Sequence, residues 1–194
     1  MKAKKPEKKI RPSKEKRKEP VVSRRRSGGQ NSAGVIVVKE IVGKEKLRMI
    51  DVAEKAETLR TAEARGEVHM SAAVLKLILE NRLPKGDVLG AARLAGIQAA
   101  KKTSALIPLC HPLRITSAEV EVRPVKSKRV VEVKSLVKAV DRTGVEMEAL
   151  TAVAVACLTV YDMCKAFDRR MVIGDIHLVT KTGGKSGDFR WDKK

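Results

Sequence analysis

The sequence predicts an α+β fold in which helices cover one face of an antiparallel sheet. Strand-like and helix-like segments alternate along the chain, and two of the strands are separated by a turn short enough for a hairpin. Only four of the 194 residues are Phe, Trp or Tyr, so the core must be aliphatic and the helices must approach closely. A core with so little aromatic bulk is easier to complete across a subunit interface, which favours an oligomer.

The first elements of the predicted domain, residues 35–194, are strands. Residues 35–42 are apolar and β-branched, which indicates a short strand or a segment that docks. Residues 58–70 alternate apolar and polar side chains around Gly66, which predicts a strand with a bulge or a bend.

Two helices are expected next. Residues 71–81 place apolar side chains at helical spacing behind Ser71, a suitable N-cap residue. Residues 87–102 form a second such segment, which Asp87 can cap and whose many Ala and Gly residues allow close packing.

The next strands have a clear alternating pattern. Residues 115–123 and 129–140 alternate valines with charged residues, and residues 124–128 between them predict the hairpin turn. A last strand is expected over residues 172–180, followed by a glycine-rich segment.

The longest predicted helix, residues 144–168, is apolar on nearly every side and should therefore be buried. Asp162 and Lys165 nevertheless lie three residues apart on one of its faces. A buried charge destabilises the fold unless it is paired, so an unpaired one is expected only where it has a functional role. The pair is either a simple ion pair or an acid and a base for catalysis.

The start of this helix carries two glutamates around Met147. Thr143 and Glu146 have the spacing of a capping box, so Glu146 has a structural explanation. Glu148 has none. The backbone N–H groups of a helix start can also bind a ligand there.

The segment LIPLCHPL at 106–113 predicts a rigid loop, because its two prolines fix the backbone on either side of Cys110 and His111. A histidine held in this way either binds a ligand and transfers protons or packs as a structural residue. A metal site at Cys110 and His111 is less favoured, because no second pair of ligands has suitable spacing.

The glycine-rich segment KTGGKSG at 181–187 is not a Walker A motif, because Val179 stands where that motif needs its first glycine and no helix follows. Its lysines, Lys181 and Lys185, either wrap a polyphosphate together with backbone N–H groups or belong to an ordinary C-terminal tail.

Two residues near the start of the domain complete the candidates. Asp51 follows an apolar pair and can cap a turn. Arg60 adds a cation suited to an anionic substrate.

The positive charge is concentrated at the N-terminus. Residues 1–46 carry 16 Lys and Arg against 5 Asp and Glu, a net charge of +11 out of +19 for the whole chain. Residues 1–34 lack apolar periodicity, so we expect a disordered basic tail, either a solvated extension, an arm for acidic partners or a targeting segment. The tail has no apolar stretch typical of a secretory signal, and its glutamates argue against a transit peptide.

The cysteine content favours a reducing, cytoplasmic environment. The cysteines are three in number and lie in apolar settings, so no disulfide framework is indicated. No apolar stretch is long enough to cross a membrane without a charge. The strands lack stacking aromatics, which argues against a nucleic-acid-binding fold, and a catalytically silent scaffold is the other alternative.

Four segments in this chain resemble the cyclic pyranopterin monophosphate synthase family, the MoaC proteins of molybdenum cofactor biosynthesis. They are MIDV at 49–52, LIPLCHPL at 106–113, GVEMEALTAVAVACLTVYDMCKA at 144–166 and KTGGKSG at 181–187. The resemblance extends over about residues 47–189. It implies a ferredoxin-like α+β sandwich that assembles as a homohexamer, a trimer of dimers, with sites at subunit interfaces.

The resemblance also implies a lyase reaction on a small nucleotide. The family converts 3′,8-cyclo-7,8-dihydroguanosine 5′-triphosphate to cyclic pyranopterin monophosphate and releases pyrophosphate. No cofactor is required, with Mg²⁺ on the substrate triphosphate left open, and neither membrane binding nor nucleic-acid binding by the tail is expected. Asp162 and Lys165 match the catalytic residues. The positions that match substrate-binding or other functional positions are Leu109, Cys110, His111, Met147, Glu148, Asp51, Arg60, Glu146 and Lys181.

Overall fold

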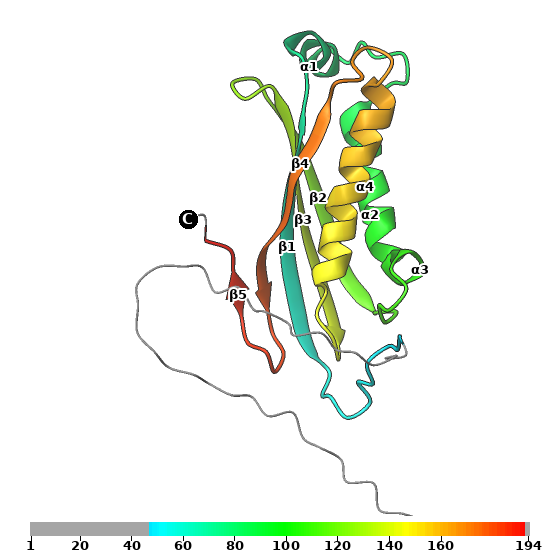
Figure 1. Ribbon diagram of the computed structural model, residues 1–194, viewed down its shortest axis with the longest axis vertical. Coiled ribbons are helices and arrows are strands. Elements are labelled where there is room, and N and C mark those ends of the chain that lie inside the picture. The colour runs from blue at the N-terminus through cyan, green and yellow to red at the C-terminus, as the bar shows by residue number, and fades with distance from the viewer. Residues whose placement is uncertain (1–46, 193–194) are drawn as a thin grey trace, which may run out of the picture. The chain divides into compact units, whose positions relative to one another are not determined.

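Strands and helices follow one another in a β-α-β-β-α-β order (Figure 1). The structure, a computed structural model, describes residues 47–192, so the expected tail over residues 1–34 and the expected strand over residues 35–42 lie outside the described residues. The strands are β1 (Thr58–His69), β2 (Ile115–Val125), β3 (Val130–Asp141), β4 (Val172–Thr182) and β5 (Phe189–Arg190). The helices are α1 (Ala72–Leu79), α2 (Val88–Lys101), α3 (Thr103–Leu106) and α4 (Glu146–Cys164).

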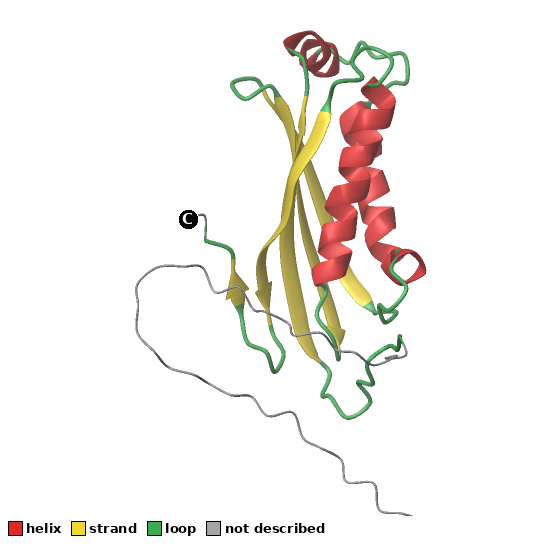
Figure 2. Ribbon diagram, in the orientation of Figure 1, coloured by secondary structure: helices red, strands yellow, loops and turns green. Residues whose placement is uncertain are grey.

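The strands form one sheet in the order β2-β3-β1-β4-β5, and every neighbouring pair is antiparallel. Without the short β5, this is the strand order of a ferredoxin-like fold. The helices α2 and α4 lie side by side over one face of the sheet (Figures 1 and 2). The predicted α+β fold class is therefore confirmed.

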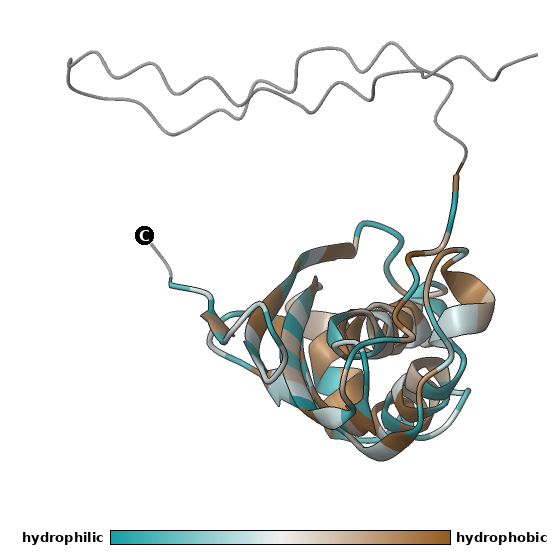
Figure 3. Ribbon diagram, turned by 90° about the horizontal axis from the view of Figure 1, so that it is seen from below, coloured by the Kyte–Doolittle hydropathy of each residue, from teal (hydrophilic) through white to brown (hydrophobic). Residues whose placement is uncertain are grey.

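The core lies between the sheet and these helices. Alternate residues of β1 and β3 are buried against the helices, and most of the residues between them are charged or polar (Figure 3). The predicted irregularity in β1 is confirmed, because its pairing with β4 shifts between Arg65 and Glu67. Gly66 is needed there, since a Cβ atom would lie 2.7 Å from Cγ1 of Val153 on α4.

The two expected N-caps are confirmed. The Ser71 side chain accepts a hydrogen bond from the backbone N–H of Val74, and the Asp87 side chain accepts one from that of Gly90. Pro124 lies in β2 instead of in the turn. Proline is tolerated there because β2 is the edge strand of the sheet.

The long helix α4 is shorter than predicted and lies in the core. It runs from Glu146 to Cys164, whereas the prediction covered residues 144–168. By length and composition it could cross a membrane, but 56% of its apolar window is buried inside the protein. The helix is therefore apolar because it packs against the sheet and α2.

Candidate active site

The loop that carries Cys110 and His111 connects α3 to β2 and lies next to the start of α4. Both side chains are half-buried, and Leu109 beside them is exposed. Burial raises the pKa of the Cys110 thiol, and the charge of Glu148 raises it further. The loop and the first turn of α4 therefore form one neighbourhood, as expected for parts of a single site.

Glu148 is the most unusual ionisable group of this neighbourhood. It is only 3% exposed. Burial raises its pKa to about 7, against the lowering effect of a backbone hydrogen bond, and the charges of Glu146 and Asp141 raise it further. A carboxyl group with such a pKa can give or take a proton near neutral pH.

The capping-box interpretation of Glu146 is wrong. The helix starts later than that motif requires, with Val145 as the N-cap residue and no side-chain cap. Glu146 is therefore the first helical residue, and its side chain reaches β4, where its carboxylate lies 3.1 Å from Nζ of Lys181. Exposed Met147 follows it on the same helix. The structure thus joins Glu146 and Lys181, two predicted site residues.

A pocket of about 930 Å³ opens beside this ion pair, large enough for a nucleotide. We call it the basic pocket, because five of its lining residues are lysine or arginine and only two are acidic. The charged lining residues are Lys55, Arg60, Arg142, Lys181, Lys185, Glu54 and Glu146. Such a lining favours an anionic ligand.

The glycine-rich segment forms one wall of the basic pocket as a tight turn between β4 and β5. Gly183 and Gly184 both have positive φ angles, near 87° and 88°, which side chains rarely adopt. Lys181 donates a hydrogen bond to Oγ of Ser186 at 2.9 Å, and the Asp188 carboxylate accepts one from the Gly183 N–H at 3.1 Å. The segment is therefore a built turn instead of an ordinary tail.

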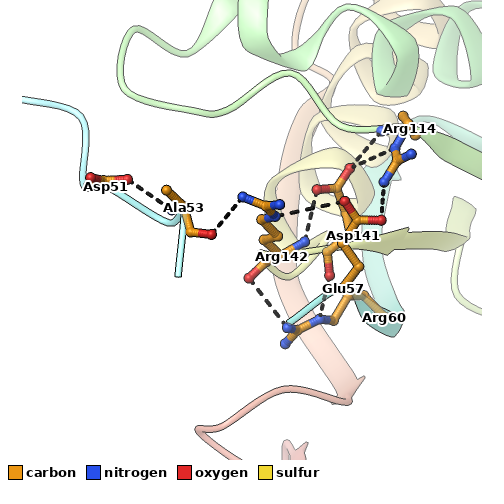
Figure 4. Close-up of polar contacts among 7 residues, drawn as sticks. All are labelled: Asp51, Ala53, Glu57, Arg60, Arg114, Asp141 and Arg142. Carbon is orange, nitrogen blue, oxygen red and sulfur yellow. Dashed lines mark hydrogen bonds and ion pairs between the residues drawn. The ribbon is translucent and has the colours of Figure 1, made fainter. Parts of the chain in front are cut away.

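Arg60 lines the basic pocket, whereas Asp51 does not line it and lies away from Arg60 (Figure 4). The Arg60 guanidinium is buried and donates hydrogen bonds to the backbone carbonyls of Asp141 and Arg142, at 3.2 and 3.3 Å. Asp51 accepts a hydrogen bond from the backbone N–H of Ala53 at 2.8 Å, as in a capped turn. The turn-capping interpretation of Asp51 is therefore the one that the structure supports.

Asp162 and Lys165 meet at the other end of α4, together with a third residue. One Asp162 oxygen lies 2.7 Å from Nζ of Lys165, and the other lies 2.7 Å from Nζ of Lys85. The sequence analysis did not identify Lys85 as a site residue. No spacing rule relates Lys85 to Asp162, so only the fold could reveal the contact.

These charges are not buried, in contrast to the prediction from the apolar helix. The side chains of Asp162 and Lys165 are each 54% exposed. Hydrogen bonds from Lys165 and Lys85, with their charges, lower the pKa of Asp162 to about 2. The apolar pattern misled because α4 has one solvent-facing stripe near its end, on which Leu158 is also exposed.

The site residues therefore fall into two groups within one chain. Glu148 and Asp162 are fourteen residues apart on one helix, which corresponds to about 21 Å along the axis. The first group lies around the basic pocket and the loop, and the second is the Lys85–Asp162–Lys165 cluster. One small nucleotide cannot contact both groups of the same chain.

No metal centre is found at either group in the described part of the chain. Between residues 47 and 192, the one set of His, Cys and acidic side chains close enough to share an ion is Glu67, His69 and Asp175. It lies on the sheet and includes neither Cys110 nor His111.

The comparison with known proteins assigns these motifs to one family. The model of the MoaC family matches residues 49–184, about two thirds of the chain. The chain belongs to the MoaC family. The MoaC match contains every predicted site residue, from Asp51 to Lys181, and leaves out residues 1–48 and 185–194.

Similar MoaC proteins share one name, cyclic pyranopterin monophosphate synthase. The relative from Parvibaculum lavamentivorans is 60% identical over 143 residues, which are 74% of this chain and 89% of the relative. The relative from Pelotomaculum thermopropionicum is 58% identical over 142 residues, 73% of this chain and 84% of the relative. The relative from Thermomicrobium roseum is 59% identical over 143 residues, which are 74% of this chain and 86% of the relative.

Proposed function

We propose that this chain is a cyclic pyranopterin monophosphate synthase, a lyase of molybdenum cofactor biosynthesis. It converts (8S)-3′,8-cyclo-7,8-dihydroguanosine 5′-triphosphate to cyclic pyranopterin monophosphate and releases pyrophosphate. One observation carries the proposal: cations suited to a triphosphate line a pocket together with Glu146, whose charge acts on the buried Glu148 carboxyl group, and burial raises the pKa of Glu148 to about 7. Relatives named for this activity are up to 60% identical.

The basic pocket binds the triphosphate. Closing the cyclic phosphate forms an O–P bond at the α-phosphorus and breaks the bond to the β-phosphate, so that pyrophosphate leaves and the attacking hydroxyl loses a proton. The negative charge that develops on the phosphates needs fixed cations. Arg60, Lys181 and Lys185 supply these cations, and the paired glycines of the turn let the backbone approach the phosphates.

Glu148 and His111 handle protons at the base. Opening the purine ring requires proton transfer to and from ring atoms. Glu148 holds a proton near neutral pH, and His111 lies on the loop that adjoins it. Leu109, Cys110 and Met147 line the same region and contact the substrate without exchanging protons.

A second copy of the chain supplies the Lys85–Asp162–Lys165 cluster. The cluster lies about 21 Å from Glu148 along α4 of its own chain, so the substrate reaches a cluster only from another subunit. Exposed apolar residues on and after α4, Leu158 and Phe167, indicate a surface for that subunit. An assembly of three dimers, a homohexamer, provides six such sites.

Within the cluster, Asp162 orients the two lysines. A carboxylate with a pKa of about 2 is a weak base, but it fixes two ammonium groups on either side of it. Lys165 and Lys85 then stabilise negative charge on the substrate.

The proposal includes no resident metal. The donor set of the basic pocket is mainly cationic, so it suits phosphate oxygens and not a divalent ion. A Mg²⁺ ion, if used, is carried by the triphosphate. The protein works in the cytoplasm, and its N-terminal tail takes no part in nucleic-acid binding.

Turnover of the cyclised nucleotide tests the function. The wild-type protein should release pyrophosphate and form a product that oxidises to a fluorescent pterin. Asp162→Asn should lower kcat about 100-fold or more, because the lysines lose their ionic partner. Asp175→Asn, at an exposed aspartate on the opposite face of the sheet, is the matched control and should keep full activity. A folded wild-type oligomer that forms neither product would refute the proposal.

A further inference from the structure

We propose that Asp141 is a positioning residue that fastens the loop carrying Cys110 and His111 to the start of α4. The inference rests on the proposed function of that site. The Asp141 carboxylate accepts two backbone hydrogen bonds at once (Figure 4). Its Oδ2 accepts the N–H of Arg114 at 3.1 Å, and its Oδ1 accepts the N–H of Arg142 at 2.8 Å. We call this pair of hydrogen bonds the backbone clasp.

The clasp replaces sheet pairing where the sheet ends. The pairing of β2 with β3 is irregular between Ile115 and Ser117, and Ile115 is the first residue of β2 with a partner. The N–H of Arg114, one residue earlier, lies beyond the ladder. Asp141, the last residue of β3, extends the contact with its side chain. Asp141 thereby gives the Arg114 N–H an acceptor within the protein at the point where the ladder ends.

The two ends of the clasp lead directly to the site. Arg114 immediately follows the loop at 106–113, whereas Arg142 begins the short segment that enters α4 and ends before Glu146. The clasp therefore sets the position of Cys110 and His111 relative to Glu148. The influence of Glu148 on the pKa of Cys110 shows that these groups are neighbours.

Ion pairs surround the clasp but are more exposed than it is. The Arg114 guanidinium contacts the Glu57 carboxylate, and Arg142 lies 3.7 Å from the same group. The Arg114 side chain is 68% exposed, however, whereas that of Asp141 is 16% exposed. Exposed pairs contribute little, so the backbone bonds should hold the loop.

Asp141 remains ionised at working pH. Burial alone would raise its pKa, but the two backbone N–H bonds and the charges of Arg114 and Arg142 outweigh burial and lower it. A charged acceptor makes stronger hydrogen bonds than a neutral one.

Two variants separate the clasp from the ion pairs. Asp141→Ala removes both acceptors, while Arg114→Ala removes the guanidinium but keeps the backbone N–H that Asp141 binds. In Asp141→Ala we expect kcat to fall about 10- to 100-fold with KM within about threefold, because the loop shifts while Lys181 and Lys185, which the clasp does not hold, stay in place. Arg114→Ala should keep kcat within about threefold.

The loop position is measured independently of activity. Cys110 is half-buried while Cys157 and Cys164 are buried, so a thiol reagent should label Cys110 first. Labelling of Cys110 and hydrogen exchange at the Arg114 amide should both be faster in Asp141→Ala and unchanged in Arg114→Ala. Asp141→Ala with wild-type kcat, or with unchanged labelling and exchange, would overturn the proposal. An inactive wild-type protein would instead refute the proposed function.

Discussion

Glu148 carries its proton into a pH range where an ordinary glutamate is ionised. Its surroundings account for this: the side chain is buried, and the carboxylates of Glu146 and Asp141 lie near it. The charge of Glu148 in turn raises the pKa of the Cys110 thiol, which lies on the neighbouring loop. Because Glu148 is buried, its ionisation at high pH destabilises the fold. The same burial keeps the carboxyl protonated near neutral pH, where it can serve as a proton donor.

A change of Glu148 to Gln should therefore affect stability in a pH-dependent way. Below about pH 4.5 the Glu148 carboxyl is protonated in both the folded and the unfolded chain, so its ionisation does not lower the stability of the fold. As pH rises to about 7, the unfolded chain ionises while the folded chain keeps the proton, and stability is lost. Glu148→Gln escapes this loss and should gain up to about 3 kcal/mol relative to wild type between pH 4 and pH 8.

Denaturant unfolding at both pH values measures this gain, with Glu119→Gln, at an exposed position on β2, as the control. The same variant should lose activity, because an amide cannot give its proton to the substrate. Wild-type turnover should fall as pH rises through about 7, and the residual turnover of Glu148→Gln should lack that decline. An equal stability difference at pH 4 and pH 8 would contradict the assigned environment.

Single residues also show how far sequence reasoning reaches. The motifs identified the loop, Glu148, Lys181 and Asp162, because their residue types and spacing are visible along the chain. They could not reveal that Glu146 faces Lys181 or that Lys85 binds Asp162, since both contacts join distant segments. The capping box failed because the start of a helix is decided by its packing as well as by its pattern.

At the scale of elements, the packing of α4 against α2 and β1 decides the geometry of both groups of site residues. Small residues permit the approach. A Cβ atom at Gly96 on α2 would lie 2.9 Å from the backbone oxygen of Ala152 on α4. The oxygen belongs to the helix backbone, so it cannot move aside alone.

Gly96→Ala should thus destabilise the fold, even though alanine favours helices. The added methyl group must push α2 and α4 apart, and such overpacking costs about 1–3 kcal/mol. Thermal unfolding should show a lower Tm for this variant. Gln98→Ala, on the exposed side of the same helix, should leave Tm nearly unchanged. A Tm for Gly96→Ala at or above the wild-type value would show that the helices are not in close contact.

The elements themselves were largely predictable. Alternating valines specified β2 and β3, and Ser71 and Asp87 fixed the starts of α1 and α2. The short β5 was missed, because a two-residue strand is too brief to show a period. The exposed end of α4 could not be predicted, because an apolar pattern alone does not show which turns of a helix the rest of the fold covers.

At the scale of the whole molecule, the length of α4 determines how far apart the two groups of candidate site residues lie. The helix separates Glu148 from Asp162 by about 21 Å, so under the proposed function the two groups of candidate side chains act together only across subunits. In the proposed enzyme, a complete catalytic site therefore requires an oligomer.

Mixing two inactive variants tests this claim most directly. Glu148→Gln and Asp162→Asn chains, each with only residual activity alone, are co-expressed so that they assemble together. A site formed by two subunits takes its Glu148 from one chain and its Asp162 from another, so random assembly leaves about a quarter of the sites with both native residues. The mixed oligomer should therefore recover about a quarter of the wild-type turnover. Mixed oligomers no more active than the separate variants would contradict a site shared between subunits.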